Sequence, residues 1–398
     1  MSHRLLHYSM ALLMQLFISV GLLAVPLFAT QLGATTFELG VIGMLGGAAY
    51  AFTVVAAGTL SDKLGRKRVI IGGTLFTGLV YILMPMSRAP AHLFLLSALS
   101  GCAMAFFWPV LEAWMSEVGS ADEVGRGLGG FNVSWSAGGC VGPFIGGVLY
   151  TKSSVLAFLF AAAGTVVVAC LAYLHKRPAP LPTAHSRETH AFETDAPIRV
   201  DRRLLYAVWA SNCASWFAIA ELRVLFPKLA LVDLEMQPWM IGMLLFMLGL
   251  VLTVMFYIMG VWKRWHSTTL PLLYAQILVI ALLLIMVIAD SPVVLGIVFA
   301  GLGAGFGITY SYSLYFSIVG SIEKGAASGR HEMVLGVGGL LGPFLGGAAA
   351  ELFHWQRAPY VLGALLILTS VAFQEFMLTR KDGVRSSQFT LGPPPSVK

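Results

Sequence analysis

The chain alternates between long apolar stretches and short polar ones. A transmembrane helix needs about 20 predominantly apolar residues to cross the hydrocarbon core of a bilayer. Twelve stretches approach or exceed that length, so the pattern predicts an all-α integral membrane protein with twelve transmembrane helices. The predicted helices cover residues 5–29, 38–60, 68–87, 91–115, 126–150, 154–174, 204–227, 238–262, 268–289, 292–316, 329–352 and 358–378.

Two polar stretches define the expected domain organisation. The longest polar interruption runs from His175 to Arg203 and is rich in Pro, His and Arg, which is typical of a flexible linker. The tail from Lys381 to Lys398 contains three consecutive prolines, and we expect it to be disordered. The sequence therefore predicts an N-terminal six-helix bundle (1–174), a cytoplasmic linker (175–203), a C-terminal six-helix bundle (204–380) and a cytoplasmic tail (381–398).

The two halves carry similar short stretches in the same order, about 200 residues apart. Residues 42–45 recur at 241–244, residues 118–120 recur at 319–321, and the glycine-proline pattern of 138–147 recurs at 338–347. Three matches at nearly one offset, in equivalent helices, indicate a six-plus-six internal repeat. Halves of equal topology related by an axis along the membrane normal are a transporter architecture.

Composition excludes the soluble classes of protein. Apolar residues make up 58% of the chain and charged residues only 11%, against roughly 25% charged residues in a soluble domain. Mean hydropathy is +0.82. This excludes a water-soluble enzyme and a disordered protein. The net charge is +6, and the basic residues that cause it lie between the apolar runs. This placement is typical of residues that set the orientation of a membrane protein, so we expect no nucleic-acid partner.

The distribution of basic residues predicts the orientation. If the N-terminus is cytoplasmic, 20 of the 25 Lys and Arg residues fall in cytoplasmic segments. Only Arg88, Lys152, Lys228 and Arg357 fall in outer loops. By the positive-inside rule, we expect a multi-pass protein of the cell (inner or plasma) membrane with both termini in the cytoplasm.

A loop motif between the second and third predicted helices carries a family resemblance. Residues 58–68 match the pattern G-x-L-x-D-x-x-G-R-K-x, and the whole chain resembles the major facilitator superfamily. The resemblance implies a cytoplasmic latch between the two halves, formed by Gly58, Asp62, Gly65, Arg66 and Lys67. Glycine at position 65 allows a tight turn with positive φ, and the Asp62 carboxylate can accept hydrogen bonds from a helix terminus. The equivalent stretch 260–266 of the second half lacks the acid.

A second motif resembles the antiporter-associated motif of the same family. Glycines at i, i+4 and i+8 form a flat stripe that allows another helix to approach closely, and the proline can bend the helix. We expect a hinge or seal between the halves, although ordinary helix packing is an alternative. The residues are Gly138, Gly142, Pro143 and Gly146, with a copy at Gly338, Gly342, Pro343 and Gly346. Many proton-coupled exporters of the family carry an arginine where this chain has Ser97, so proton coupling would need another acid.

Polar residues within the predicted helices are candidates for the substrate or proton site, because charge inside a membrane is costly and usually functional. Three of the candidates have an alternative explanation that involves no transport role. Glu112 could be an acid at the membrane interface, Arg223 could extend to the outer surface, and Glu332 could be an acid favoured by a helix N-terminus. The resemblance implies a central cavity lined by helices 1, 4, 7 and 10. The candidates are Gln15, Trp108, Glu112, Asn212, Trp216, Arg223, Tyr310, Tyr312 and Glu332.

Together these features predict a secondary active transporter of a small organic solute. Aromatic residues on the expected cavity helices favour an amphipathic or aromatic solute, exported against protons. An importer or facilitator, or a non-transporting membrane sensor on the same fold, remains the alternative. The chain has no P-loop, nucleophile elbow or zinc-binding motif. We therefore expect no enzymatic activity, no cofactor and no metal, and a monomer whose partners are the substrate and the lipid bilayer.

Overall fold

The computed structural model describes residues 3–116, 121–174, 200–319 and 324–379, and these residues form helices with no strand among them. The predicted tail and most of the predicted linker lie outside the described residues. The first half contains α1 (His3–Gln31), α2 (Thr36–Leu64), α3 (Arg66–Leu83), η1 (Met84–Met86), α4 (Pro90–Ala105), α5 (Trp108–Ser116), α6 (Ala121–Lys152) and α7 (Ser154–Leu174).

The second half follows the same order of long helices. It contains α8 (Arg202–Val224), α9 (Phe226–Lys228), η2 (Leu229–Asp233), α10 (Pro238–Val261), η3 (Lys263–Ser267), α11 (Leu270–Met286), α12 (Pro292–Val319), α13 (Lys324–Leu352) and α14 (Ala358–Thr379). Among the described residues, nine helical stretches are long and apolar enough to span a membrane. The more polar α6 and α8 and the shorter α11 complete the twelve-helix fold predicted from the sequence.

The fourth predicted helix is broken into α4 and α5. Pro109 lies two residues after the break, and proline can neither donate a backbone hydrogen bond nor tolerate the carbonyl four residues earlier in a regular helix. The chain turns at Phe106 and Phe107, whose amides bond to the Ala103 and Met104 carbonyls. The apolar pattern did not predict this break, which changes the direction of the residues that follow, including Glu112.

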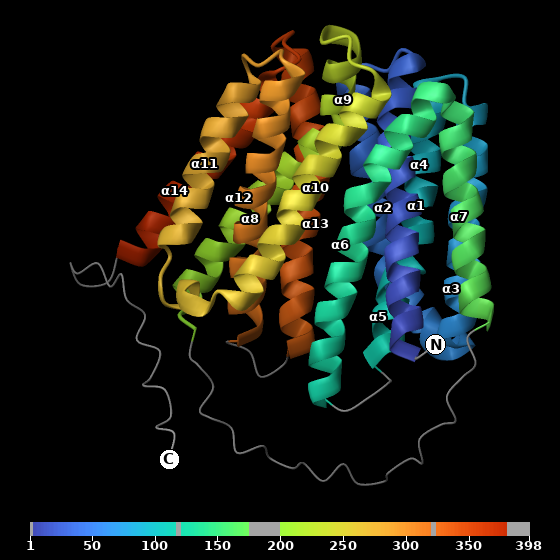
Figure 1. The fold of residues 1–398 in the computed structure, drawn as a ribbon, viewed down its shortest axis with the longest axis horizontal. Coiled ribbons are helices and arrows are strands. Elements are labelled where there is room, and N and C mark those ends of the chain that lie inside the picture. The colour runs from blue at the N-terminus through green and yellow to red at the C-terminus, as the bar shows by residue number, and fades with distance from the viewer. Residues whose placement is uncertain (1–2, 117–120, 175–199, 320–323, 380–398) are drawn as a thin grey trace.

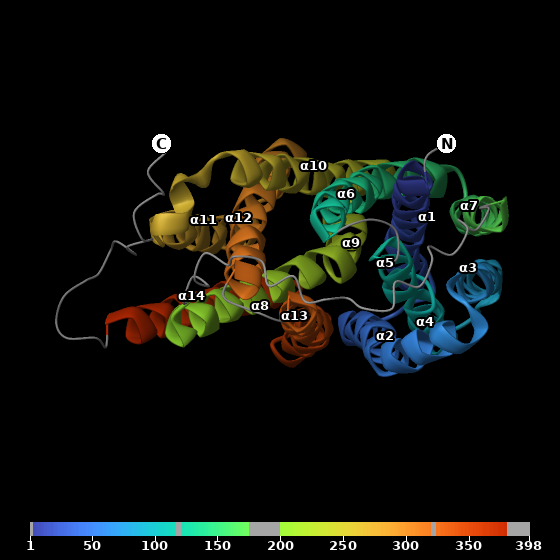
Figure 2. The ribbon, with the colours of Figure 1, turned by 90° about the horizontal axis from the view of Figure 1, so that it is seen from below.

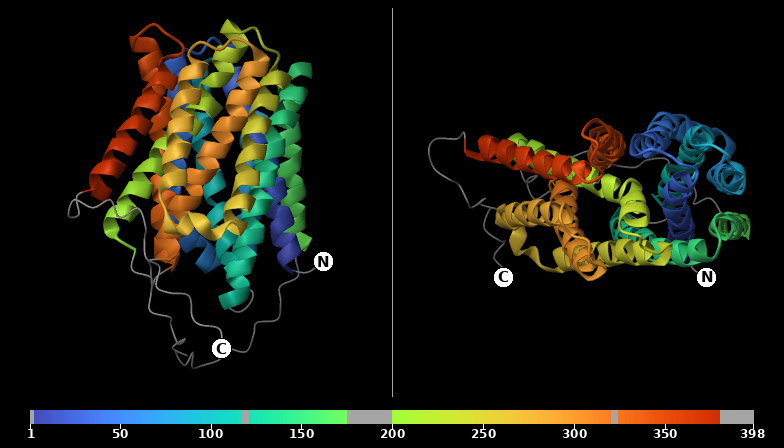
Figure 3. Two further views of the ribbon diagram at one scale, coloured as in Figure 1. Left: turned by 60° about the vertical axis from the view of Figure 1, so that its left-hand side comes forward. Right: turned by 90° about the horizontal axis from the view of Figure 1, so that it is seen from above.

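The helices form two groups that lie side by side (Figures 1 and 2). We name the end at which α1 and α8 begin the lower end. The opposite end, which carries residues 32–35, 225–237 and 353–357, is the upper end (Figure 1). Between the groups, α10 runs beside α6 on one side and α13 beside α2 on the other (Figures 2 and 3).

The apolar cores show where the two halves are joined. One buried cluster includes residues of both halves, among them Leu39, Ile42, Leu222 and Ile241. At the lower end the cores are separate: one cluster contains only first-half residues, and another only second-half residues. Among the described residues, burial of apolar surface therefore joins the halves towards the upper end, whereas the clusters at the lower end stay within one half each.

Polar contacts between the halves lie at the upper end too. The Lys228 ammonium donates to the Ala34 carbonyl at 2.6 Å, and the Trp239 amide donates to the Thr151 hydroxyl at 3.1 Å. The Thr36 hydroxyl bonds to the Gln356 side chain. At the lower end, no hydrogen bond or ring contact joins the halves among the residues that the structure describes. The upper end is thus the closed end of this conformation.

Candidate transport cavity and its gates

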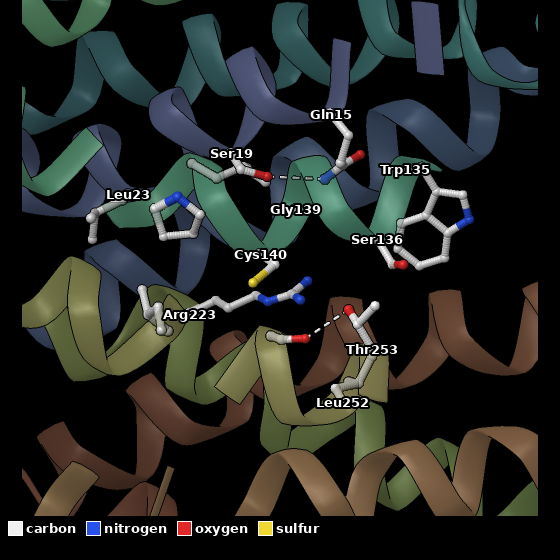
Figure 4. Close-up of a pocket in the computed structure, with 14 residues that line it drawn as sticks. Gln15, Ser19, Leu23, Trp135, Ser136, Gly139, Cys140, Arg223, Leu252 and Thr253 are labelled. Atoms are coloured by element: carbon white, nitrogen blue, oxygen red, sulfur yellow. Dashed lines mark hydrogen bonds between the residues drawn. The ribbon is translucent and has the colours of Figure 1, made fainter. Parts of the chain in front are cut away.

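A pocket lies between the two halves, bordered by α1, α6, α8 and α10 (Figure 4). Its cavity volume is about 50 Å³ in this conformation, within about 620 Å³ of space between the atoms that includes its open mouth. Its lining is mainly apolar, with neutral polar side chains at intervals and one charged group. The residues are Gln15, Ser19, Leu22, Leu23, Trp135, Ser136, Gly139, Cys140, Pro143, Arg223, Leu245, Gly249, Leu252 and Thr253. A cavity shared by both halves is where alternating access requires a substrate site.

The guanidinium of Arg223 extends into this pocket and not towards the outer surface (Figure 4). It lies over the Trp216 ring, with the guanidinium carbon 5.8 Å from the ring centroid. Gln15 lies across the pocket, where its amide donates to the Ser19 hydroxyl at 3.1 Å. The structure therefore brings three predicted site residues, Gln15, Trp216 and Arg223, to one region between the halves.

Two further candidates, Glu112 and Glu332, come from opposite halves. Glu112 lies on α5 and Glu332 near the start of α13, both towards the lower end. Their side chains are accessible to solvent, yet protein surrounds them on most sides. They lie close enough for their charges to interact with each other and with the hydroxyl groups of Tyr50 and Tyr310. The two acids thus lie towards the lower end of opposite halves, within range of each other's charge.

The predicted aromatic residues divide into two environments. Trp216 and Tyr310 lie together, with ring centroids 6.3 Å apart. Trp108 instead packs inside the first half against Phe107 at 5.1 Å. Tyr312 is fully buried, and its hydroxyl donates to the Thr268 carbonyl at 2.7 Å, so it holds the η3 segment in place.

Asn212 differs from the expectation of a cavity-facing amide. Its side chain is fully buried, and neither of its polar atoms has a hydrogen-bond partner. On α8 it is one turn from Trp216, yet it does not line the described pocket. Burial of this kind is costly.

The glycine-proline motifs pack in a way that the sequence did not show. A side chain at Gly138 or Gly142 would meet the Leu12 or Leu16 carbonyl of α1, in the same half. In the second half, side chains at Gly338 and Gly342 would likewise meet carbonyls of α8. The glycine stripe that was expected to form a hinge or seal between the halves therefore packs within each half, as in the alternative of ordinary helix packing.

The neighbouring face of each motif makes the contact between halves. The Pro143 carbonyl of α6 lies where a side chain on Gly242 of α10 would project, and the Pro343 carbonyl of α13 lies where one on Gly40 of α2 would project. A side chain at Gly347 would approach the Thr36 carbonyl to 2.6 Å. These crossings, related by the internal repeat, close the upper end, and we name them the upper gate: Gly40, Pro143, Gly147, Gly242, Pro343 and Gly347.

The loop motif adopts the expected turn. Gly65 has φ +88°, and its amide donates to the Ser61 carbonyl at 3.0 Å. Asp62 and Arg66 form an ion pair at 2.6 Å, and Arg66 also donates to the Ser61 hydroxyl. Lys67 lies over the Tyr173 ring of α7, within the first half. A side chain at Gly58 would meet nothing within 4 Å, so no described segment packs closely against Gly58 in this conformation.

Several functional candidates were not found from the sequence. Gly40 and Gly242 lie outside both motifs, although the repeat of residues 42–45 at 241–244 pointed to that region. Thr253 and Cys140 line the pocket. The sequence did not single them out, because both lie within ordinary apolar stretches. Glu221 is fully buried within the second half, and its carboxylate has no hydrogen-bond partner among the described residues. Among the described residues, no cluster of side chains could hold a metal ion.

Comparisons with known proteins agree with this architecture. A family model described as Major Facilitator Superfamily matches residues 8–322. The chain is 26% identical to multidrug resistance protein 1 of Bacillus subtilis (strain 168), over 78% of this chain and 82% of that protein. It is 20% identical to quinolone resistance protein NorA of Staphylococcus aureus (strain MRSA252), over 87% and 89%.

The fold is also shared with solved structures. A bacterial homolog of the human lysosomal transporter Spinster, in an inward-facing and occupied conformation, superposes with a TM-score of 0.76, at 11% identity and 98% coverage of both chains. The family match spans most of the chain, and it agrees with the loop motif, the two similar halves and the pocket between them. The chain is a multi-pass membrane protein and belongs to the major facilitator superfamily of transporters.

Proposed function

We propose that the chain exports a small organic solute in exchange for protons, by alternating access. The observation that carries the proposal is the pocket between the halves, closed above by the upper gate and bordered by both bundles. Rocking of the halves about this pocket would open the upper gate and close the lower end. The proposal places the lower end and both termini in the cytoplasm of the cell (inner or plasma) membrane, because basic residues concentrate there.

The pair Glu112 and Glu332 supplies the proton coupling in this proposal. Closing the lower end would bring α5 and α13 towards each other, and two ionised carboxylates in one enclosed space repel each other. Binding a proton removes that repulsion, so the closed lower end favours the protonated pair. A proton taken up when the upper end is open is then released at the lower end. No cofactor is needed, and one copy of the chain contains the whole pathway.

The relatives guide the choice of solute. Two of them are named for multidrug and quinolone resistance. The pocket here is mainly apolar, with Trp135 in its lining and Trp216 packed against Arg223. Both facts favour an amphipathic or aromatic organic solute over a sugar or a nucleotide. We propose that such a solute is the cargo.

Flux measurements in proteoliposomes test the proposal. We expect an imposed proton gradient to drive accumulation of at least one member of a panel that contains a quinolone and other aromatic solutes. Glu112→Gln should abolish gradient-driven accumulation and leave solute exchange at equal pH measurable. Glu235→Gln is the matched control, because Glu235 is an exposed acid in the connection before α10. Equal gradient-driven accumulation in wild type and Glu112→Gln would remove Glu112 from the coupling, and binding without flux would indicate a sensor.

A further inference from the structure

Arg223 is the charged residue of the pocket, and the protein does not neutralise it. No carboxylate pairs with its guanidinium and no side chain accepts a hydrogen bond from it, as far as the described residues show. A cation at membrane depth costs several kcal/mol unless it is paired or hydrated. Arg223 is half-buried, so the open pocket can admit water to its guanidinium, but its surroundings give the charge no structural role.

The residues around Arg223 orient its guanidinium but accept no hydrogen bond from it, as far as the described residues show. The Trp216 ring holds one face of the guanidinium by a cation–π contact, which leaves its N–H groups free to donate. The pocket hydroxyls nearby are already engaged: Ser136 donates to the Val133 carbonyl at 3.1 Å, and Thr253 donates to the Gly249 carbonyl at 2.8 Å. Arg223 is thus the main unused donor of the pocket (Figure 4).

The two halves contribute different chemistry to the same space. Arg223 comes from α8 of the second half, whereas Gln15 and Trp135 come from α1 and α6 of the first half. A bound molecule with an anionic group on Arg223 would place its apolar body against Trp135 and the pocket leucines, and it would bridge both halves. The lining itself contains no acid, so nothing in it would repel such an anion.

We infer that the substrate is an organic anion, a carboxylate or sulfonate on an apolar body, and that Arg223 binds its charged group. This inference rests on the proposed transport function and adds to it the charge of the cargo. Arginine binds carboxylates through two parallel hydrogen bonds, which a lysine at the same place cannot reproduce. The anion also provides the partner that Arg223 lacks in the protein.

Binding to the purified protein tests the inference separately from transport. The probes are a panel of aromatic carboxylic acids, among them dansylglycine, each paired with its uncharged methyl ester, and affinity is measured by titration in detergent. We expect acids to bind and their esters to bind about 10- to 100-fold more weakly, the range for losing hydrogen bonds to a charged group. Arg223→Gln should weaken acid binding by a similar factor, and Arg223→Lys by less.

Arg88→Gln is the matched control, because it removes one positive charge from an exposed position away from the pocket, and it should bind the acids like wild type. Size-exclusion profiles establish that each variant is folded. The inference is overturned if esters bind as tightly as acids, if no acid binds, or if Arg223→Gln retains wild-type affinity for the acids. If acids bind through Arg223 but no flux is seen in proteoliposomes, only the transport proposal is contradicted. If the protein transports cations and Arg223→Gln leaves that flux unchanged, only the anion site is contradicted.

Discussion

Adding a single methyl group to the upper gate should open it. Gly242 on α10 faces Pro143 and Phe144 on α6, and a Cβ at position 242 would lie 3.1 Å from the Phe144 Cα and closer still to the Pro143 carbonyl oxygen. The obstacle is backbone, which cannot rotate away as a flexible side chain could. In Gly242→Ala, the two helices must therefore separate at this crossing.

The size of the effect follows from the cost of overpacking. An extra methyl group in a tight contact costs about 1–3 kcal/mol. The gain in helix propensity on replacing glycine by alanine, about 1 kcal/mol, applies equally when the gate is open and closed, so it cancels. The overpacking cost acts only on the closed gate, so the open population should rise about 5- to 150-fold.

The native Cys140 reports on the gate. It lines the pocket, is 4% exposed, and its thiol contacts the Phe246 carbonyl across the two halves. With the other three cysteines replaced by serine, a membrane-impermeant thiol reagent is applied from the side of the upper end, and an epitope tag after Lys398 identifies the opposite side. We expect labelling of Cys140 in Gly242→Ala to accelerate by the factor given above.

Gly260→Ala is the matched control, because Gly260 lies on the same helix and a side chain there would meet nothing within 4 Å. Its labelling rate should equal that of the parent protein. If Gly242→Ala and Gly260→Ala were labelled at the same rate from the upper side, the crossing of α6 and α10 would not be a gate, and the reasoning from the close backbone contact would be refuted.

Two further predictions concern the turn between α2 and α3. Asp62→Asn removes the charge that pairs with Arg66 on an exposed surface, so the protein should fold normally. Transport should be far slower, because the closed lower end loses its latch. Wild-type flux at equal expression would contradict this. Gly65→Val places a β-branched residue at φ +88°, which costs about 1–3 kcal/mol, so a lower melting temperature than that of Gly58→Val is expected in a thermal unfolding assay.

The sequence predicted the parts of this structure that depend on local pattern. Apolar runs of sufficient length predicted all twelve membrane segments, and the requirement for positive φ predicted the turn at Gly65. The break between α4 and α5 was missed because a hydropathy pattern does not register one proline. Periodicity showed that Gly138 and Gly142 share a helix face, but only the three-dimensional packing shows which helix that face contacts.

The candidate site was predicted less completely, for the same reason. Trp216 and Arg223 were both predicted site residues, and their spacing of seven residues puts them on one face of a helix. The structure brings them together in a cation–π contact. Tyr312 was expected in the cavity as well, but its hydroxyl bonds to the Thr268 carbonyl inside the second half. The spacing of residues along the sequence shows which face of a helix each side chain occupies. How deeply that side chain is buried, and which helix it contacts, depend on tertiary packing that no single segment encodes.

The most direct test of the account is to lock the upper gate and measure flux. Phe37 of α2 and Phe344 of α13 face each other across the halves, with ring centroids 5.7 Å apart. In a protein without native cysteines, Phe37→Cys and Phe344→Cys are joined by a short cleavable thiol cross-linker and the protein is reconstituted. The account predicts that cross-linking stops gradient-driven flux and that cleavage restores it, whereas each single cysteine variant is unaffected. Undiminished flux through the fully cross-linked protein would contradict alternating access through this gate.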